Sequence, residues 1–206
     1  MAYLKIEVAL KGVSKRVYRD FYVKDDILLE EFGIKVLSTF NVQFEHCFLF
    51  SLGAKKEYVL PEWLEEYPDF YAGTYKGMKL LDMPRDDKNR FVLEYDTGEG
   101  YEFNVTISDE KIDKITSKEN MVCIGGRGEG IFENDRYLLT LFLKLNSMEK
   151  ALAHCSDGEE HYHTPYNTSM DDSSTTKEYF EPLDLDYINE RMECDYNSYM
   201  DQSSNN

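Results

Sequence analysis

The sequence predicts an α+β protein: a mixed, mainly antiparallel sheet built from β-hairpins with covering helices, plus an acidic C-terminal extension. Three observations support this prediction. Apolar and polar residues alternate on both sides of two turns, apolar residues at helical spacing follow, and the composition changes near residue 154. With 206 residues, 42% of them hydrophobic, the chain can bury the core of one domain, which we place at 1–153. The extension occupies 154–206.

The first elements are predicted to be a β-hairpin and a helix. Residues 3–10 and 17–23 alternate between apolar and polar side chains, and Gly12 lies in the turn between them. A helix is expected over 27–40, although Gly33 weakens it because glycine is unfavourable in a helix interior. The apolar positions at helical spacing are Leu29, Phe32, Val36 and Phe40.

The middle of the chain predicts a second hairpin. A short apolar run at 45–52 fits a buried strand, and an irregular or short helical segment surrounds Trp63. The chain from there to Arg90 is predicted to be mostly loop. Residues 91–107 alternate on both sides of a Thr-Gly-Glu-Gly turn, which is the clearest hairpin pattern in the sequence.

A strand and a helix are predicted to complete the domain. The strand at 121–124 leads into a glycine-rich stretch at 125–130, and the helix is expected over 136–152. Asn134 or Asp135 can cap this helix, because their side chains accept hydrogen bonds from the first free backbone N–H groups.

The C-terminal extension is predicted to be partly disordered. Residues 154–177 are polar and poor in aliphatic side chains, so they are expected to form a mobile connector. A short amphipathic helix near 184–194 follows, and we expect it to dock on the domain through Leu185, Ile188 and Met192.

Charge and cysteine content disfavour several functional classes. The net charge is −17, and residues 151–206 carry thirteen acidic and only two basic groups, a field that repels phosphate backbones. No run of about eighteen apolar residues could cross a membrane, and the alternating N-terminus is unlike a signal peptide. The four widely spaced cysteines fit free thiols, so we expect a cytoplasmic protein with no membrane association.

Three ordered motifs accompany this pattern. The second hairpin carries a tyrosine, an aspartate, a glycine and an acid, followed by an aromatic residue and a glutamate. A cysteine, two spaced glycines and an acid come next, and an aromatic-acid-proline triplet at 180–182 precedes the last helix. The residues of the first two motifs are Tyr95, Asp96, Gly98, Glu99, Tyr101, Glu102, Cys123, Gly126, Gly128 and Glu133.

Together with the first hairpin, these motifs resemble the plasmid pRiA4b ORF-3-like family, also called the insertion-element passenger TnpR family. The resemblance implies a protein associated with mobile elements and without an established activity. The chain departs from it at Tyr101-Glu102-Phe103, where many relatives have tryptophan, glutamate and histidine, and at Ile131-Phe132, where a proline pair is usual. A serine recombinase, which the TnpR name suggests, needs a nucleophilic serine among arginines, and no such arrangement is found.

The two main motif regions allow a chemical and a structural interpretation. Glu94, Asp96, Glu99 and Glu102 could hold a divalent cation or act as acid and base, but strand alternation favours a solvated rim. The glycine stretch at 125–130 could cradle a phosphate. It lacks the spacing of a P-loop or a dinucleotide fingerprint, so a tight turn is the expected role.

Histidines and cysteines offer weaker candidates. His154, Cys155, His161 and His163 lie close in sequence but match no common zinc spacing. Cys123 ends an apolar run and is expected to be a buried, unreactive thiol, with His46 beside Cys47 as the nearest candidate base. We therefore predict no metal and no cofactor.

Two surfaces are candidates for binding. The basic cluster of the first hairpin, Lys11, Lys15, Arg16 and Arg19, is small for a phosphate-binding patch. The tyrosine-rich acidic extension suits docking onto a basic protein, because charge speeds the encounter and aromatic rings supply buried area. The partner-binding residues expected there are Tyr179, Phe180, Tyr187 and Ile188.

The function we favour is a non-enzymatic protein-interaction module with an unknown, basic protein partner. One alternative is a metal-dependent enzyme that uses the Asp96, Glu99 and Cys123 region. The other is nucleic-acid binding through the first hairpin, which the overall charge disfavours.

Overall fold

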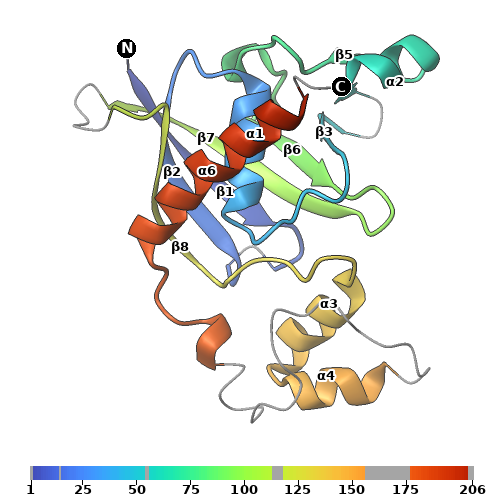
Figure 1. The fold of residues 1–206 in the computed structure, drawn as a ribbon, viewed down its shortest axis with the longest axis vertical. Coiled ribbons are helices and arrows are strands. Elements are labelled where there is room, and N and C mark those ends of the chain that lie inside the picture. Colours follow the sequence, from blue (N-terminus) through green and yellow to red (C-terminus); the bar gives the residue numbers. More distant parts are fainter. Residues whose placement is uncertain (1, 14, 54–55, 113–117, 156–176, 204–206) are drawn as a thin grey trace.

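A computed structural model describes residues 2–13, 15–53, 56–112, 118–155 and 177–203. One sheet of eight strands runs through them in the order β5-β4-β3-β6-β7-β1-β2-β8, with helices packed around it (Figure 1). The strands are β1 (Tyr3–Leu10), β2 (Tyr18–Lys24), β3 (Phe48–Ser51), β4 (Glu57–Val59), β5 (Gly73–Thr74), β6 (Arg90–Tyr95), β7 (Tyr101–Ile112) and β8 (Met121–Arg127). The helices are α1 (Leu29–Ser38), α2 (Pro61–Glu66), α3 (Arg136–Leu145), α4 (Met148–His154) and α6 (Leu185–Ser203), with a short 3-10 turn at Leu80–Asp82.

The two predicted hairpins form the centre of the sheet. β1 pairs antiparallel with β2 on one side and with β7 on the other, and β6 pairs antiparallel with β7. The pair β4 and β5 is parallel, so the sheet is mixed but mainly antiparallel, as predicted. Alternation explains the result, because every second residue of β6, and of β7 from Tyr101 to Ile107, is buried in the core.

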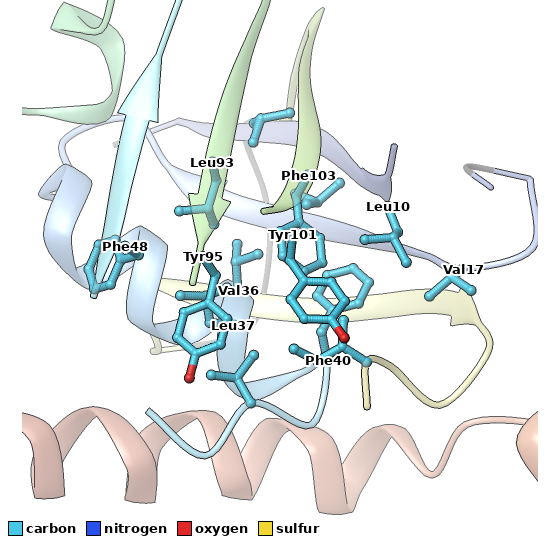
Figure 2. Close-up of a cluster of buried hydrophobic side chains, with 14 of the residues drawn as sticks. Leu10, Val17, Val36, Leu37, Phe40, Phe48, Leu93, Tyr95, Tyr101 and Phe103 are labelled. Atoms are coloured by element: carbon cyan, nitrogen blue, oxygen red, sulfur yellow. The ribbon is translucent and has the colours of Figure 1, made fainter. Parts of the chain in front are cut away.

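Helix α1 lies against the core face of the sheet, and Gly33 makes this close approach possible. A Cβ atom at Gly33 would lie 2.8 Å from the Phe50 ring and 2.9 Å from the Phe48 ring. The low helix propensity of Gly33 is therefore offset by packing, since a larger side chain would push α1 away from β3. Figure 2 shows Val36, Leu37 and Phe40 of this region facing the side chains of β6 and β7.

Helix α6 is longer than the short helix predicted near 184–194. It spans 19 residues and lies beside α1 (Figure 1). Ile188 and Met192 are buried in the core, and Tyr196 and Tyr199 pack against it. Part of the expected extension is thus covered by the domain, while 156–176, the bulk of the predicted connector, lies outside the described residues.

The helix predicted over 136–152 is two helices. Asn146 adopts a left-handed conformation with φ 54° and ends α3, and the Ser147 hydroxyl caps α4 by accepting from the N–H of Lys150. Asp135 is the N-cap of α3, since its side chain accepts from the N–H of Leu138. The stretch predicted as loop before Arg90 contains the short strand β5 and the 3-10 turn.

Candidate functional sites

The motif at 95–102 comprises the last residue of β6, the turn between β6 and β7, and the first two residues of β7. Asp96 adopts a left-handed conformation with φ 52°, and its Oδ1 accepts hydrogen bonds from the backbone N–H groups of Gly98 at 3.1 Å and Glu99 at 3.2 Å. The aspartate is 5% exposed. This local bonding explains why an acid follows the tyrosine here, because an Asp side chain stabilises such a turn.

This turn meets the segment before α3. The Tyr95 hydroxyl donates to Glu133 Oε1 at 2.5 Å, and the Tyr101 hydroxyl donates to the carbonyl of Phe132 at 2.5 Å. The Glu99 carboxylate accepts from the backbone N–H of Arg136 at 3.0 Å. Five of the residues singled out from the sequence therefore lie together: Tyr95, Asp96, Glu99, Tyr101 and Glu133.

A loop that sequence reasoning did not connect with this site completes it. His46 Nε2 lies 2.5 Å from Asn134 Oδ1 and 3.6 Å from Asp96 Oδ2. Glu45 accepts from Asn134 Nδ2 at 3.0 Å. No sequence spacing signals this approach, because 88 residues separate His46 from Asn134 and only the fold joins them. We call Glu45, His46, Asp96 and Glu133 the hairpin-end cluster.

Burial controls the ionisation of the tyrosines beside this cluster. Desolvation, and then the hydrogen bond to Glu133, raises the pKa of Tyr95 far above its usual range. Desolvation likewise raises the pKa of Tyr101. Both phenols therefore stay protonated at neutral pH and serve as hydrogen-bond donors.

Cys123 lies elsewhere in the sheet. Across β2 and β1 it is level with Ile107 of β7, three strands away, or about 14 Å at the usual strand spacing. Tyr101, next to the hairpin turn, is about 20 Å further along β7. The structure thus does not bring Cys123 and the carboxylates of Asp96 and Glu99 into one cleft.

The surroundings of Cys123 are those of a structural thiol. It is 1% exposed, and burial raises its pKa to about 11. Both of its backbone polar groups are bonded to the Asn189 side chain of α6, at 2.8 Å and 3.0 Å. A thiol of this kind stays protonated at neutral pH and is a poor nucleophile.

The glycines of the second motif allow close packing. A Cβ atom at Gly126 would lie 2.4 Å from the Tyr18 carbonyl oxygen, and one at Gly128, where φ is 72°, would lie 2.8 Å from the Arg16 carbonyl oxygen. Their role in this structure is to let β8 and the following turn approach the first hairpin, which only glycine permits.

The residues expected to bind a partner differ in accessibility. Tyr179 is buried, and its hydroxyl donates to the Gly130 carbonyl at 2.5 Å. Phe180 is half-buried beside the guanidinium groups of Arg16 and Arg127. Ile188 is in the core, whereas Tyr187 is 60% exposed. Of the four, Tyr187 is the residue that this structure presents openly to a partner.

Three of the four basic residues of the first hairpin are engaged within the chain, and Lys15 is exposed. Arg19 is fully buried, Arg16 binds the Leu143 carbonyl and the Asn146 side chain, and Lys11 forms an ion pair with Glu102 at 2.6 Å. A buried guanidinium cannot reach a phosphate. This arrangement gives no support to the first hairpin as a nucleic-acid interface.

A pocket that the sequence did not reveal lies between α2 and the strands β3, β4 and β6. Its aromatic lining comes from Trp63, Tyr67 and Tyr71, and the Trp63 and Tyr71 ring centroids are 6.4 Å apart. The volume is about 450 Å³. Phe70, next to this lining, is 77% exposed. The remaining lining residues are Leu49, Glu57, Glu66, Glu94 and Thr97.

Three carboxylates face this pocket, which we call the acidic aromatic pocket. Glu57, Glu66 and Glu94 form no ion pair with any described residue, and no lysine or arginine lines the described part of the pocket. Desolvation, and then the nearby carboxylates of Glu102 and Glu57, raises the pKa of Glu94. Negative charge is thus concentrated beside aromatic faces.

The described residues define a class of protein: a one-sheet α+β domain in which a long C-terminal helix covers the sheet and two polar sites lie at its edge and end. None of the described helices is long and apolar enough to cross a membrane. The chain belongs to the plasmid pRiA4b ORF-3-like family, whose profile matches residues 2–185.

Comparison with solved structures supports the same fold. The crystal structure of the protein of unknown function MM3350 from Methanosarcina mazei Go1 superposes with a TM-score of 0.57 at 13% sequence identity. The match covers 77% of this chain and 91% of that chain. No match is found among curated proteins.

Proposed function

We propose that the protein is a non-enzymatic interaction module that binds a basic partner protein, with an arginine or lysine side chain of the partner entering the acidic aromatic pocket. The observation that carries this proposal is the convergence of three carboxylates, none in an ion pair with a described residue, with Trp63, Tyr67 and Tyr71. Aromatic faces attract cations, and a cation over such a ring gains about 0.5–1 kcal/mol at an exposed site and about 2 kcal/mol when it is desolvated.

The pocket chemistry selects a cation over other ligands. An anion would meet repulsion from Glu57, Glu66 and Glu94, and a neutral apolar ligand would leave the negative charge of these carboxylates without a compensating cation. A guanidinium group offers both a planar face for stacking and N–H donors for carboxylates. An arginine side chain can therefore stack on the aromatic rings and donate hydrogen bonds to the carboxylates of the same pocket.

The ionisation of Glu94 supports the same proposal. Its raised pKa means that the charged carboxylate is less favourable in the folded protein than in the unfolded chain. Charges held together at the expense of stability are typical of binding sites, because the ligand supplies the missing opposite charge. A bound cation removes the repulsion between Glu94 and its neighbours.

The partner that fits is a protein and not a nucleic acid. The net charge of −17 repels phosphate backbones but accelerates encounters with a basic surface. The outer face of α6 adds to this field, since Asp186, Glu190 and Asp201 are exposed there together with Tyr187. Phe70 supplies an exposed aromatic anchor beside the pocket.

Trp63 gives a direct test, because it is the single tryptophan of the chain. Full-length protein is titrated with an arginine-rich peptide, a lysine-rich peptide and a glutamate-rich peptide, and Trp63 fluorescence is recorded. We expect a saturable change with the arginine peptide, a weaker one with the lysine peptide and none with the glutamate peptide. The affinity is expected to fall as salt is added.

Two double variants separate the pocket from the general acidic field. Glu57→Gln with Glu94→Gln removes two charges from the pocket, and we expect binding to weaken about tenfold. Asp186→Asn with Glu190→Gln removes two charges from the exposed face of α6 and is expected to change affinity little. Equal losses in both variants, or no response of Trp63 to any peptide, would contradict the proposal.

A further inference from the structure

We propose that the hairpin-end cluster binds one divalent first-row transition metal ion. Ligand atoms of Glu45, His46 and Glu133 lie within 4.8 Å of one another, and Asp96 Oδ2 is 3.6 Å from His46 Nε2. Glu45, His46 and Glu133 require only side-chain adjustments to reach a common ion, since metal–ligand bonds of about 2.0–2.2 Å hold ligand atoms about 3–4 Å apart. We assign Asp96 as the fourth ligand from its contact with His46. The site shares no residue with the acidic aromatic pocket.

Two of the four ligands are buried carboxylates that lack a permanent cationic partner. Glu133 is 2% exposed and Asp96 is 5% exposed. Among the described residues, neither forms an ion pair with lysine or arginine, and Asp96 Oδ2 lies 3.6 Å from His46 Nε2. Buried carboxylates are ordinarily paired or bound to a metal, because isolated charges are strongly disfavoured away from water.

A second layer of hydrogen bonds orients these ligands. Glu133 accepts from the Tyr95 hydroxyl at 2.5 Å and from the backbone N–H of Gln43 at 3.1 Å. Asp96 Oδ1 is held by two backbone N–H groups of the turn, which leaves Oδ2 directed toward His46. Asn134 Nδ2 holds Glu45. Metal sites are built in this way, with outer partners that fix each ligand.

The donor set indicates the kind of metal. One imidazole with three carboxylates suits Zn²⁺ or Mn²⁺, whereas Mg²⁺ and Ca²⁺ prefer oxygen ligands alone and Cu(I) prefers sulfur. The close contact between His46 Nε2 and Asn134 Oδ1 has to open for the imidazole to bind the ion. We therefore expect a zinc or manganese site formed by residues from three separate segments of the chain.

The test uses metal-free, full-length protein titrated calorimetrically with Zn²⁺ and Mn²⁺, with thermal unfolding recorded in parallel. We expect one ion per chain and a higher unfolding temperature with the ion present, since a ligand that binds only the folded state stabilises it. Co²⁺ absorption spectra report the coordination geometry and ligand field of the bound ion. An absence of saturable binding overturns the proposal.

Variants locate the ion. His46→Ala changes a partly exposed side chain, and Asp96→Asn keeps a residue type that tolerates the left-handed turn, so both are expected to fold. Each should weaken binding at least tenfold, and Tyr95→Phe, which removes an outer hydrogen bond, should weaken it about tenfold. The cobalt spectrum of His46→Ala should shift, because loss of the imidazole changes the ligand field.

The matched control removes competing histidines. His161→Ala with His163→Ala disrupts the other group of possible ligands in the sequence and is expected to leave affinity, stoichiometry and the cobalt spectrum unchanged. Loss of binding in this control, together with unchanged binding in His46→Ala, would assign the ion to the histidine-rich segment and overturn the proposal. The peptide titration of Trp63 is independent of this result.

Discussion

At the scale of one residue, Arg19 links three segments of the fold through hydrogen bonds. Its guanidinium group donates five hydrogen bonds, two to the Thr39 carbonyl and one each to the carbonyls of Tyr18, Arg127 and Glu129. The side chain is fully buried, and desolvation lowers its pKa to about 10. Arg19 therefore joins β2, the end of α1 and the glycine turn after β8.

Replacing Arg19 should destabilise the protein strongly. Arg19→Met leaves several buried carbonyl groups without a donor, so we expect the free energy of unfolding to fall by about 3–5 kcal/mol. Urea denaturation measures the loss. Arg90→Met, which removes an exposed arginine paired with Asp86, is the matched control and should have little effect. Equal effects of the two substitutions would contradict the role of Arg19.

Glu94 yields a prediction about pH. Desolvation and neighbouring carboxylates raise its pKa in the folded protein, so the folded state holds this proton more tightly than the unfolded chain. Stability is therefore lost as the pH rises through the raised pKa, and is fully retained below the ordinary value of 4.5. Glu94→Gln should be more stable than the parent protein at pH 7, by about 0.5 kcal/mol after screening by solvent.

The measurement is urea unfolding at pH 7 and pH 4. The advantage of Glu94→Gln should shrink at the lower pH, because the parent carboxyl becomes protonated there. Glu190→Gln changes the same charge on the exposed face of α6 and serves as the control. If Glu94→Gln is less stable than the parent protein at pH 7, the Glu94 carboxylate stabilises the fold and is not held against net repulsion.

At the scale of elements, α6 covers the β8 edge of the sheet. β8 is an edge strand, and the Asn189 side chain binds both backbone polar groups of Cys123 on its open side. Lys35 of α1, almost fully buried, forms ion pairs with Glu31 at 3.0 Å and with Glu193 of α6 at 2.6 Å. Covering an edge in this way satisfies its hydrogen bonds and prevents pairing with other chains.

Removing this cover should weaken the edge. Asn189→Ala leaves the N–H and carbonyl groups of Cys123 without their partner, at a cost of about 1–3 kcal/mol in the free energy of unfolding. Hydrogen exchange at the Cys123 amide should become faster than in the parent protein. Asn197→Ala, at an exposed position of the same helix, is the control. Unchanged exchange at Cys123 would show that Asn189 does not protect the strand.

At the scale of the whole molecule, the C-terminal residues complete the core. Tyr179 and Met192 are each 1% exposed, and Tyr179 packs between Phe132 and Phe142. The family profile extends to residue 185, well past the boundary predicted at 153. Helix α6 and Tyr179, which belong to the predicted extension, therefore pack on residues of the predicted domain.

A chain that ends at Ala153 should fail to fold cooperatively. It lacks Tyr179, Ile188 and Met192, so a large apolar surface of α1 and β8 becomes exposed. Thermal unfolding followed by circular dichroism should show a broad transition or none. A chain that ends at Ser203 is the control and should keep the sharp transition of the full protein. A sharp transition with the parent midpoint in the shorter chain would make 1–153 an independent domain.

Local patterns in the sequence determined much of this architecture. The hairpins near 3–23 and 91–107, helix α1 and the mainly antiparallel sheet follow from periodicity, since alternation and helical spacing dictate which side chains can be buried together. The acidic character of the surface follows from composition. Periodicity does not reveal the roles of Gly33 and Asn146, because Gly33 makes room for the Phe50 ring and Asn146 ends α3 in a left-handed conformation.

The tertiary structure alone decided where the sites lie. It brings His46 and Glu133 to the turn at Asp96, separates that turn from Cys123, and assembles the acidic aromatic pocket from α2 and three strands. The physical reason is that local periodicity specifies which face of an element is apolar but not which distant segment will cover it. Contacts between such segments form only when the whole core packs.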